Sequence, residues 1–336
     1  MRSHVVNTHS LRSLQYSVNV LILSTGADTA GQGYAMKRAL DRYAPGLTVR
    51  QLAAAGRNRY LAYPQDLVYG KPSEAAEWYR WADVVHLANT LYAWERWDVG
   101  RLHKRLVLHH HGTEYREGHR TLYAKARAVG AVQVAATLDL VGLEPDVQWL
   151  PATADGNNLT RYRSWRAGAP GSLRVVHAPT DRAVKGTAAV VAAVRQLQGA
   201  GLDVTLDLVE GVSNDECLAR KGRADVVVDQ LGLGYGVNAV EAWGMGLPVV
   251  AGVASPRVRD DMVACWGQLP FAEATPGTLA DVLADFAVNL DTRAHYAARG
   301  QAHFAQWHRE DVVAQQLAGI YADAGRTTRR LVLQEG

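Results

Sequence analysis

Short apolar runs separated by helix-length segments are the feature that most restricts how this chain can fold. Continuous apolar runs, in place of strict alternation, are typical of strands buried on both faces, as in a parallel sheet covered by helices. The helix expected first covers residues 33–44. The strands expected in this half cover residues 18–25, 48–54, 82–88, 105–112 and 131–137. The pattern predicts an α/β domain built from βαβ units.

The same pattern starts again after about residue 170. Strands are expected at 172–180, 203–211, 224–230 and 247–252, and an Ala-rich helix is expected over 187–201, between the first two of them. The chain has 336 residues, which fits two domains of about 150 residues each. We therefore predict two Rossmann-like domains that face each other across a cleft, where a ligand would bind.

The expected domain boundaries follow from composition. Residues 149–172 are rich in Gly, Pro, Asn and Arg, and the last forty residues indicate one or two helices without a strand partner. The predicted parts are an N-terminal extension (1–17), a first domain (18–155), a hinge (156–171), a second domain (172–300) and C-terminal helices (301–336).

Composition excludes several classes of protein. The net charge is only +3 and no run of five Lys or Arg occurs, so nothing requires a nucleic-acid partner. Cys217 and Cys265 have no zinc-type spacing and are too few for a disulfide framework, which indicates a reducing compartment. No apolar run approaches a membrane span or a signal peptide. We expect a soluble cytoplasmic protein.

A glycine turn follows the first expected strand. Gly31, Gln32 and Gly33 directly precede a helix, where backbone N–H groups approach a ligand closely and the helix N-terminus favours an anion. The spacing is not that of a dinucleotide fingerprint. An ordinary β-to-α turn is the alternative interpretation.

Two cations follow the first strand of the second half, in "HAPTDRAVKGT". Arg182 and Lys185 precede a long helix that begins near Thr187, and two cations beside a helix N-terminus suit a diphosphate. The alternative is that both are solvated surface residues, as most Lys and Arg are.

A second glycine turn occurs in "GLGYGVNAVEAWGMGLPVVAG", residues 232–252. Gly232, Gly234 and Gly236 open the turn, and Glu241 lies about one turn into the following helix. A carboxylate there either complements the helix dipole or accepts hydrogen bonds from two hydroxyl groups of a sugar ring.

These last two motifs together resemble the donor-binding half of the family 4 glycosyltransferases, which have the two-domain GT-B fold. Arg182, Lys185 and Gly186 match the family's R-x-x-K-G, whose cations contact the diphosphate of a nucleotide sugar. Glu241 matches the second of two signature glutamates, which holds the nucleotide ribose. Further matches are the aromatic-Gly pair and the tail of the signature: Tyr235, Gly236, Gly246, Pro248, Val249 and Val250. The resemblance covers roughly residues 18–322 and is specific only in the second domain.

The chain departs from this family at Leu233, which stands where the first signature glutamate is usual. Leucine cannot bind a sugar hydroxyl or stabilise positive charge. Asp229, four residues upstream, is the leading substitute, and the alternative for Asp229 is a structural carboxylate at the edge of the core.

Three consecutive histidines, 109–111, lie near the end of the strand expected over 105–112. On an extended chain only His109 and His111 share a face, and no third ligand is evident, so the spacing disfavours zinc. The family resemblance implies that His111 contacts a hydroxyl of the donor sugar, and also that the Gly31–Gly33 turn contacts donor phosphate or acceptor. The alternative for His111 is a histidine bonded to backbone carbonyls.

The resemblance implies a retaining glycosyltransferase whose donor is a nucleotide sugar, with UDP-sugars favoured. Arg182 and Lys185 would stabilise the departing diphosphate, and backbone groups from Gly234 to Val237 would line the donor pocket. No D-x-D occurs, so we expect neither a metal ion nor another cofactor. Because of Leu233, an inactive nucleotide-sugar-binding protein stays open, as does a GT-B-type epimerase.

The acceptor is not readable from the sequence. The compact length and residues 25–46 resemble, more loosely, glycosyltransferases encoded by bacteriophages. This implies a virion protein or a modified DNA base, and a glycan or a small molecule stays open. The Arg-containing segments 56–60 and 161–166 are the only indications of DNA binding.

Overall fold

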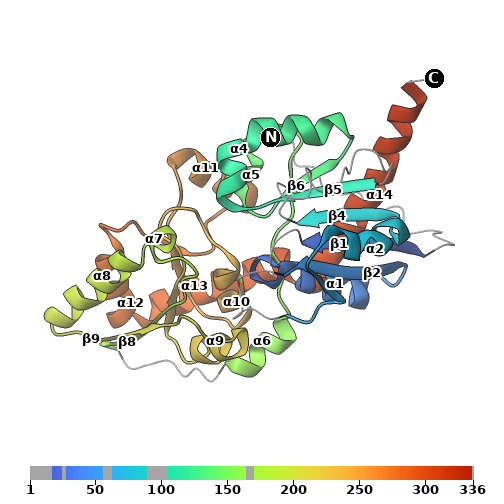
Figure 1. The fold of residues 1–336 in the computed structure, drawn as a ribbon. Coiled ribbons are helices and arrows are strands. Elements are labelled where there is room, and N and C mark those ends of the chain that lie inside the picture. Colours follow the sequence, from blue (N-terminus) through green and yellow to red (C-terminus); the bar gives the residue numbers. More distant parts are fainter. Residues whose placement is uncertain (1–16, 25–27, 56–62, 89–104, 164–169, 335–336) are drawn as a thin grey trace.

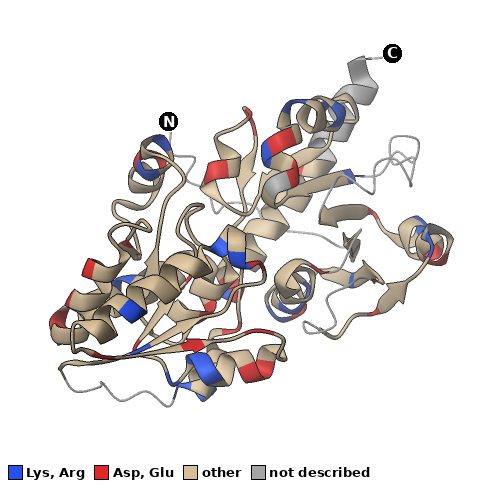
Figure 2. Ribbon diagram, turned by 60° about the vertical axis from the view of Figure 1, so that its left-hand side comes forward, with Lys and Arg blue, Asp and Glu red and all other residues tan. Residues whose placement is uncertain are grey.

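The computed structural model describes residues 17–24, 28–55, 63–88, 105–163 and 170–334. Its two parallel sheets lie in separate halves of the molecule (Figure 1). The predicted α/β fold with two Rossmann-like domains is therefore confirmed. The helices carry most of the charged residues, and the strands carry few (Figure 2). No helix in the described part of the chain is long and apolar enough to cross a bilayer.

The first sheet has seven parallel strands in the order β3-β2-β1-β4-β5-β6-β7. Its strands are β1 (Val18–Ser24), β2 (Leu47–Ala54), β3 (Leu67–Tyr69), β4 (Val84–Ala88), β5 (Arg105–His110), β6 (Val132–Ala135) and β7 (Gln148–Trp149). The helical segments of this half are η1 (Thr29–Gly31), α1 (Gln32–Tyr43), η2 (Pro72–Ala75), α2 (Ala76–Trp81), α4 (Gly112–Ala128) and α5 (Leu138–Val141).

Both faces of this sheet are buried, which explains the continuous apolar runs. Along β1, Val20 and Ile22 pack with α1, whereas Leu21 and Leu23 face the opposite side with Tyr79 of α2. Successive side chains of a strand point to opposite faces, so both sets must be apolar when helices cover both sides.

The second sheet has five parallel strands in the order β12-β11-β10-β8-β9. Its strands are β8 (Ser172–His177), β9 (Asp203–Leu208), β10 (Val226–Val228), β11 (Val249–Ala251) and β12 (Ala272–Glu273). Its helices are α7 (Arg182–Lys185), α8 (Thr187–Gly199), α9 (Asn214–Lys221), α10 (Val237–Gly244), α11 (Pro256–Trp266) and α12 (Leu279–Val288).

The segment expected to be a hinge begins with a helix, α6 (Gly156–Tyr162). Asp155 caps it, because its carboxylate accepts from the N–H groups of Asn157 and Asn158 at 3.1 and 3.2 Å. The end of α6 lies so close to α9 that a Cβ on Gly222 would be 1.8 Å from the Tyr162 carbonyl oxygen. Residues 156–162 thus pack against the second domain and are not an irregular linker.

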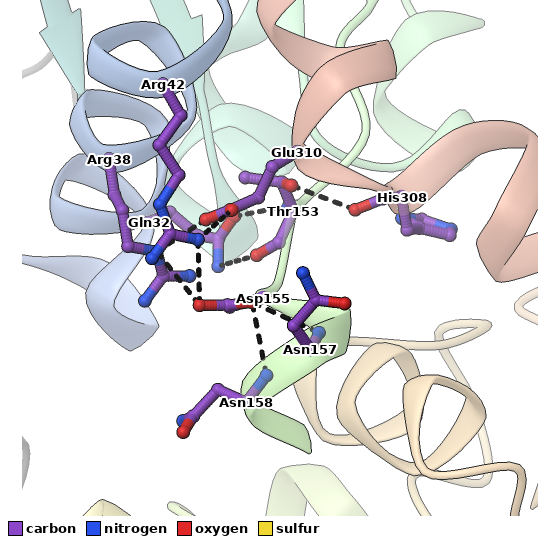
Figure 3. A network of polar contacts seen from close by, with 9 residues as sticks. All are labelled: Gln32, Arg38, Arg42, Thr153, Asp155, Asn157, Asn158, His308 and Glu310. Carbon is purple, nitrogen blue, oxygen red and sulfur yellow. Dashed lines mark hydrogen bonds and ion pairs between the residues drawn. The ribbon is translucent and has the colours of Figure 1, made fainter. Parts of the chain in front are cut away.

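The C-terminal segment returns to the first sheet. It comprises α13 (Leu290–His303), a π-helical turn η4 (Phe304–His308) and α14 (Glu310–Gln334). Val313, Ala314 and Leu317 of α14 share a buried cluster with strands β1 and β5 of the first sheet. Just before α14, the C-terminal segment also lies beside the segment that leads from β7 of the first sheet to α6. There the Thr153 hydroxyl donates to the His308 carbonyl at 2.8 Å (Figure 3). The chain therefore passes between the domains twice, at adjacent places.

Candidate functional site

The loop after β8 places the two predicted cations at the carboxyl edge of the second sheet. Asp181 caps α7 by accepting from the N–H groups of Ala183 and Val184, and Gly186 ends α7 at φ +73°. Arg182 and Lys185 are the first and last residues of α7, and their side chains take different surroundings. The Arg182 side chain is 64% exposed and forms a two-point ion pair with Glu210, in which Nε lies 2.8 Å from Oε1.

Lys185 is held at the end of β10. Its ammonium donates to the Gln230 side-chain oxygen at 2.7 Å and lies 3.3 Å from the Asp229 carboxylate. The other oxygen of Asp229 accepts from the Gly236 N–H at 2.6 Å. Burial alone would raise the pKa of Asp229, but Lys185 and the Gly236 amide together hold it below its usual range. Asp229 thus joins the loop that carries Lys185 to the second glycine turn. These contacts are those of a structural carboxylate, which was the alternative interpretation of Asp229.

The second glycine turn leads directly into α10. Gly234 has φ +84°, where glycine is favoured, and its N–H donates to the Gly252 carbonyl at 2.7 Å. Within the described residues, no hydrogen bond reaches the N–H groups of Val237 and Asn238 in the first turn of α10. These amides are the ones that a helix leaves free for a ligand.

Tyr235 is buried, and its ring points into the core of the second domain. It packs edge-on against Trp243, and its hydroxyl lies 3.2 Å from Nε2 of His308. Burial raises the pKa of this phenol strongly. The Tyr235 side chain is therefore not available to a ligand here, and any donor contact at this position would come from the backbone.

Glu241 is buried on α10 and has partners that the sequence does not indicate. Its Oε2 contacts the ammonium of Lys221, and its Oε1 accepts from the Asn214 side chain at 3.3 Å. Both partners lie on α9. Leu233 is partly buried in the turn before α10.

The first glycine turn differs from expectation because its amides are already bonded. Asp28 accepts from the Gly33 and Tyr34 N–H groups at 2.7 and 3.0 Å, and the Gly31 N–H donates to the Asp28 carbonyl. Gln32 bonds both backbone groups of Thr153 through its side chain. An anion of the protein itself therefore fills the helix N-terminus that was expected to receive a ligand phosphate. Asp28 is not the N-cap residue of α1 and reaches amides five and six residues ahead, so the sequence interpretation had no ordinary capping pattern to find.

Tyr63 covers the same turn. A Cβ on Gly31, which has φ +68°, would lie 2.4 Å from the Tyr63 ring. The Tyr63 ring stacks on Tyr34 with centroids 5.8 Å apart. Burial is the main cause that raises the pKa of Tyr63, and the Glu241 and Asp28 carboxylates add to it.

His111 ends a chain of buried aromatic groups that starts on α14. The Tyr321 hydroxyl lies 2.9 Å from Nδ1 of His86, whose Nε2 lies 3.3 Å from Nδ1 of His109. The rings of His109 and His111 are 4.1 Å apart, so the two residues share a face as expected. Nε2 of His109 and Nε2 of His111 are buried and have no hydrogen-bond partner among the described residues. Burial lowers the pKa of His111 to about 4, so the ring is neutral near pH 7. Among the described residues, no group of three or more His, Cys, Asp or Glu is arranged to hold a metal ion.

No family model and no curated protein sequence matches this chain. Solved structures do match it over nearly the whole length. Sucrose-phosphate synthase from Thermosynechococcus elongatus is 14% identical, with 91% of this chain and 98% of that chain covered and a TM-score of 0.62. The chain has the GT-B fold.

Two further matches are structures with bound nucleotide. An α-glucosyltransferase in complex with UDP and a 13-mer DNA containing an HMU base is 9% identical, covering 91% of this chain and 100% of that chain, with a TM-score of 0.67. Alr3699/HepE from Anabaena, in complex with UDP and glucose, is 15% identical with the same coverage and a TM-score of 0.62. At identities of 9–15% the similarity establishes the GT-B fold alone. The role of each residue has to be argued from its contacts in this structure.

Proposed function

We propose that the protein is a glycosyltransferase that moves a sugar from a nucleoside diphosphate sugar to an acceptor hydroxyl. The observation that carries this proposal is the position of Lys185: a Cβ on Gly236 would lie 3.5 Å from its ammonium nitrogen. A cation therefore stands beside the N-terminus of α10, where the amides of Val237 and Asn238 are free within the described residues. A lysine and the positive end of a helix together favour a phosphate group. Two of the matching GT-B structures hold UDP, which supports a nucleotide as the ligand.

The chemistry assigned to these groups is stabilisation of the leaving group. As the bond from the anomeric carbon to the diphosphate oxygen breaks, negative charge develops on that oxygen, and Lys185 with the α10 amides would stabilise it. Arg182 would join them, because its exposed ion pair with Glu210 is weak enough to exchange for a diphosphate. Glu241 would accept hydrogen bonds from the ribose, and His111 would contact a sugar hydroxyl.

We further propose retention of the anomeric configuration and independence from metal ions. The acceptor oxygen would bond to the anomeric carbon on the face that the diphosphate leaves, and the acceptor proton would pass to the departing phosphate oxygen. The absence of a D-x-D motif and the presence of Arg182 and Lys185 support diphosphate neutralisation by the protein itself. A protein or a modified DNA base is the acceptor class to test first, the latter because one matching structure holds DNA.

The test is to incubate the protein with UDP- and GDP-sugars, with and without candidate protein and DNA acceptors. Transfer of hexose, seen by mass spectrometry together with released nucleoside diphosphate, is the expected result. Saturable binding of the nucleotide sugar without any turnover would instead support an inactive binding protein. Conversion of the nucleotide sugar to an epimer without an acceptor would support the epimerase.

A further inference from the structure

Lys221 is a lysine whose side chain is only 2% exposed. Lysine is almost never this deeply buried unless it is paired, because an unpaired ammonium loses its hydration without compensation. Its ammonium contacts Oε2 of Glu241, the carboxylate assigned to the ribose. Burial opposes the charge on Lys221, but the carboxylate of Glu241 offsets this and raises the pKa of the ammonium. Lys221 therefore keeps its positive charge near neutral pH.

Asn214 holds the other oxygen of the same carboxylate. Its side-chain N–H donates to Oε1 of Glu241 at 3.3 Å. Asn214 and Lys221 are the first and last residues of α9, so the two ends of one helix fix the two oxygens of one side chain. An ionised carboxylate accepts about four hydrogen bonds, so the two contacts leave acceptor positions on both oxygens. The Glu241 side chain remains 12% exposed, which keeps part of it accessible.

We propose that Lys221 and Asn214 are positioning residues that orient Glu241 to accept both hydroxyls of a ribose, and that they thereby set how strongly the site prefers a ribonucleotide over its deoxy forms. This inference rests on the proposed function. A charged acceptor fixed in this way forms a strong hydrogen bond with a hydroxyl group of the ligand. A deoxy sugar lacks that hydroxyl and leaves the acceptor unpaired, so it is expected to bind more weakly. Stability alone gives little reason for such a pair, because apolar replacement of a buried ion pair is often neutral or stabilising.

The experiment compares the affinity for UDP and GDP with that for their 2′,3′-dideoxy forms, by calorimetry. The wild-type protein is expected to prefer the ribonucleotide by at least about tenfold, the scale of one hydrogen bond to a charged group. Lys221→Met and Asn214→Ala are each expected to reduce this preference several-fold. Affinity for the dideoxy form should change less than affinity for the ribonucleotide.

Arg220→Met is the matched control. Arg220 is the neighbouring cation on α9, but it pairs with Asp207, with Nε 2.9 Å from Oδ2. This variant is expected to keep the wild-type preference. If Lys221→Met and Asn214→Ala weaken binding of both forms equally, the two residues are merely structural and the inference is overturned.

A double variant keeps the test valid if Lys221→Met alone fails to fold. Lys221→Met/Glu241→Met replaces the ion pair by apolar side chains and is expected to unfold cooperatively while showing no ribose preference. A wild-type preference in this variant would overturn the inference and leave the proposed function intact. Failure of the wild-type protein to bind any of these nucleotides would overturn the proposed function itself, and the inference with it.

Discussion

The Lys185 ammonium and the Asp229 carboxylate lie 3.3 Å apart where α7 meets the carboxyl end of β10. Because Asp229 also accepts from the Gly236 amide, this ion pair sets the distance between the cation and the start of α10. The pair neutralises Lys185 only in part, since Gln230 and not a second carboxylate is its other partner. The cation is therefore held in place, as the proposed contact with a phosphate oxygen requires.

Replacing Lys185 by Met is expected to reduce turnover by roughly tenfold to a thousandfold, the range for loss of one group that stabilises developing charge. Arg182→Met is expected to fall in the same range if the guanidinium leaves Glu210 for the diphosphate. Steady-state kinetics with whichever nucleotide sugar proves to be the donor in the transfer assay would measure both. Arg195→Met, at an exposed position of α8, is the control and should keep wild-type turnover. Wild-type turnover in both test variants would contradict the diphosphate assignment.

Removal of divalent metal ions is expected to leave activity intact. The charge of the leaving diphosphate would be met by Arg182, Lys185 and the α10 amides, and the sequence has no D-x-D pair to bind a cation. Turnover measured in excess EDTA should equal turnover measured with added Mg²⁺ or Mn²⁺. Complete loss in EDTA with recovery on addition of either ion would refute metal independence.

The fold could be predicted from the sequence wherever a strand is buried on both faces. β1, β2 and β8 lie within two or three residues of their predicted ends, because apolar residues on both faces leave an unmistakable run. The short edge strand β3 was missed for the opposite reason, whereas the longer edge strand β9 was predicted. β3 has only three residues, and one of them, Val68, is exposed. α6 was missed because Gly and Asn dominate its first turn, although Asp155 is a capping residue that signals a helix.

The site could be predicted only as far as local motifs carry it. The loop holding Arg182 and Lys185 has the expected place at the end of β8, since strand, loop and helix are consecutive in the chain. The partners of these side chains come from distant segments: Glu210 for one and Asp229 for the other. Lys221 gave no signal at all, because a lysine near the end of a polar helix is indistinguishable in sequence from a solvated one.

The connection between the domains offers a prediction about stability. Glu310, at the start of α14, is buried between Arg38 and Arg42 of α1, and Arg42 also donates to Asp155 at 2.9 Å (Figure 3). Glu310→Ala leaves two cations without this partner and is expected to lower the free energy of unfolding by about 1–3 kcal/mol. Urea denaturation would measure it.

Asp41→Ala is the control for the Glu310 variant. Asp41 pairs with Lys37 on the same helix, but on an exposed surface, and such pairs contribute about 0.2–0.5 kcal/mol. An equal effect of the two substitutions would show that the contacts of Glu310 with α1 do not stabilise the connection.

Acid sensitivity follows from the histidines buried at the crossing. His303 packs against Trp243 and Trp266, and its Nε2 lies 3.5 Å from the Tyr235 hydroxyl. Burial, with His308 beside it, lowers the pKa of His303 to about 2. In the unfolded chain an ordinary histidine titrates near pH 6.5. Below that pH the unfolded state binds a proton that the folded state refuses, so stability present above pH 6.5 is lost as the pH falls.

The loss amounts to about 1.4 kcal/mol per pH unit for each such group, or about 2 kcal/mol for His303 at pH 5. His308, whose pKa burial lowers to about 4, adds to this slope over the same interval. His303→Phe removes one titrating group while keeping an aromatic ring in the cluster. The slope of the unfolding free energy against pH gives the number of protons taken up on unfolding. In this variant the slope between pH 7 and pH 5 should therefore decrease by an amount that approaches one proton. A slope equal to that of the wild-type protein would mean that His303 is already protonated, or accessible to protons, in the folded state.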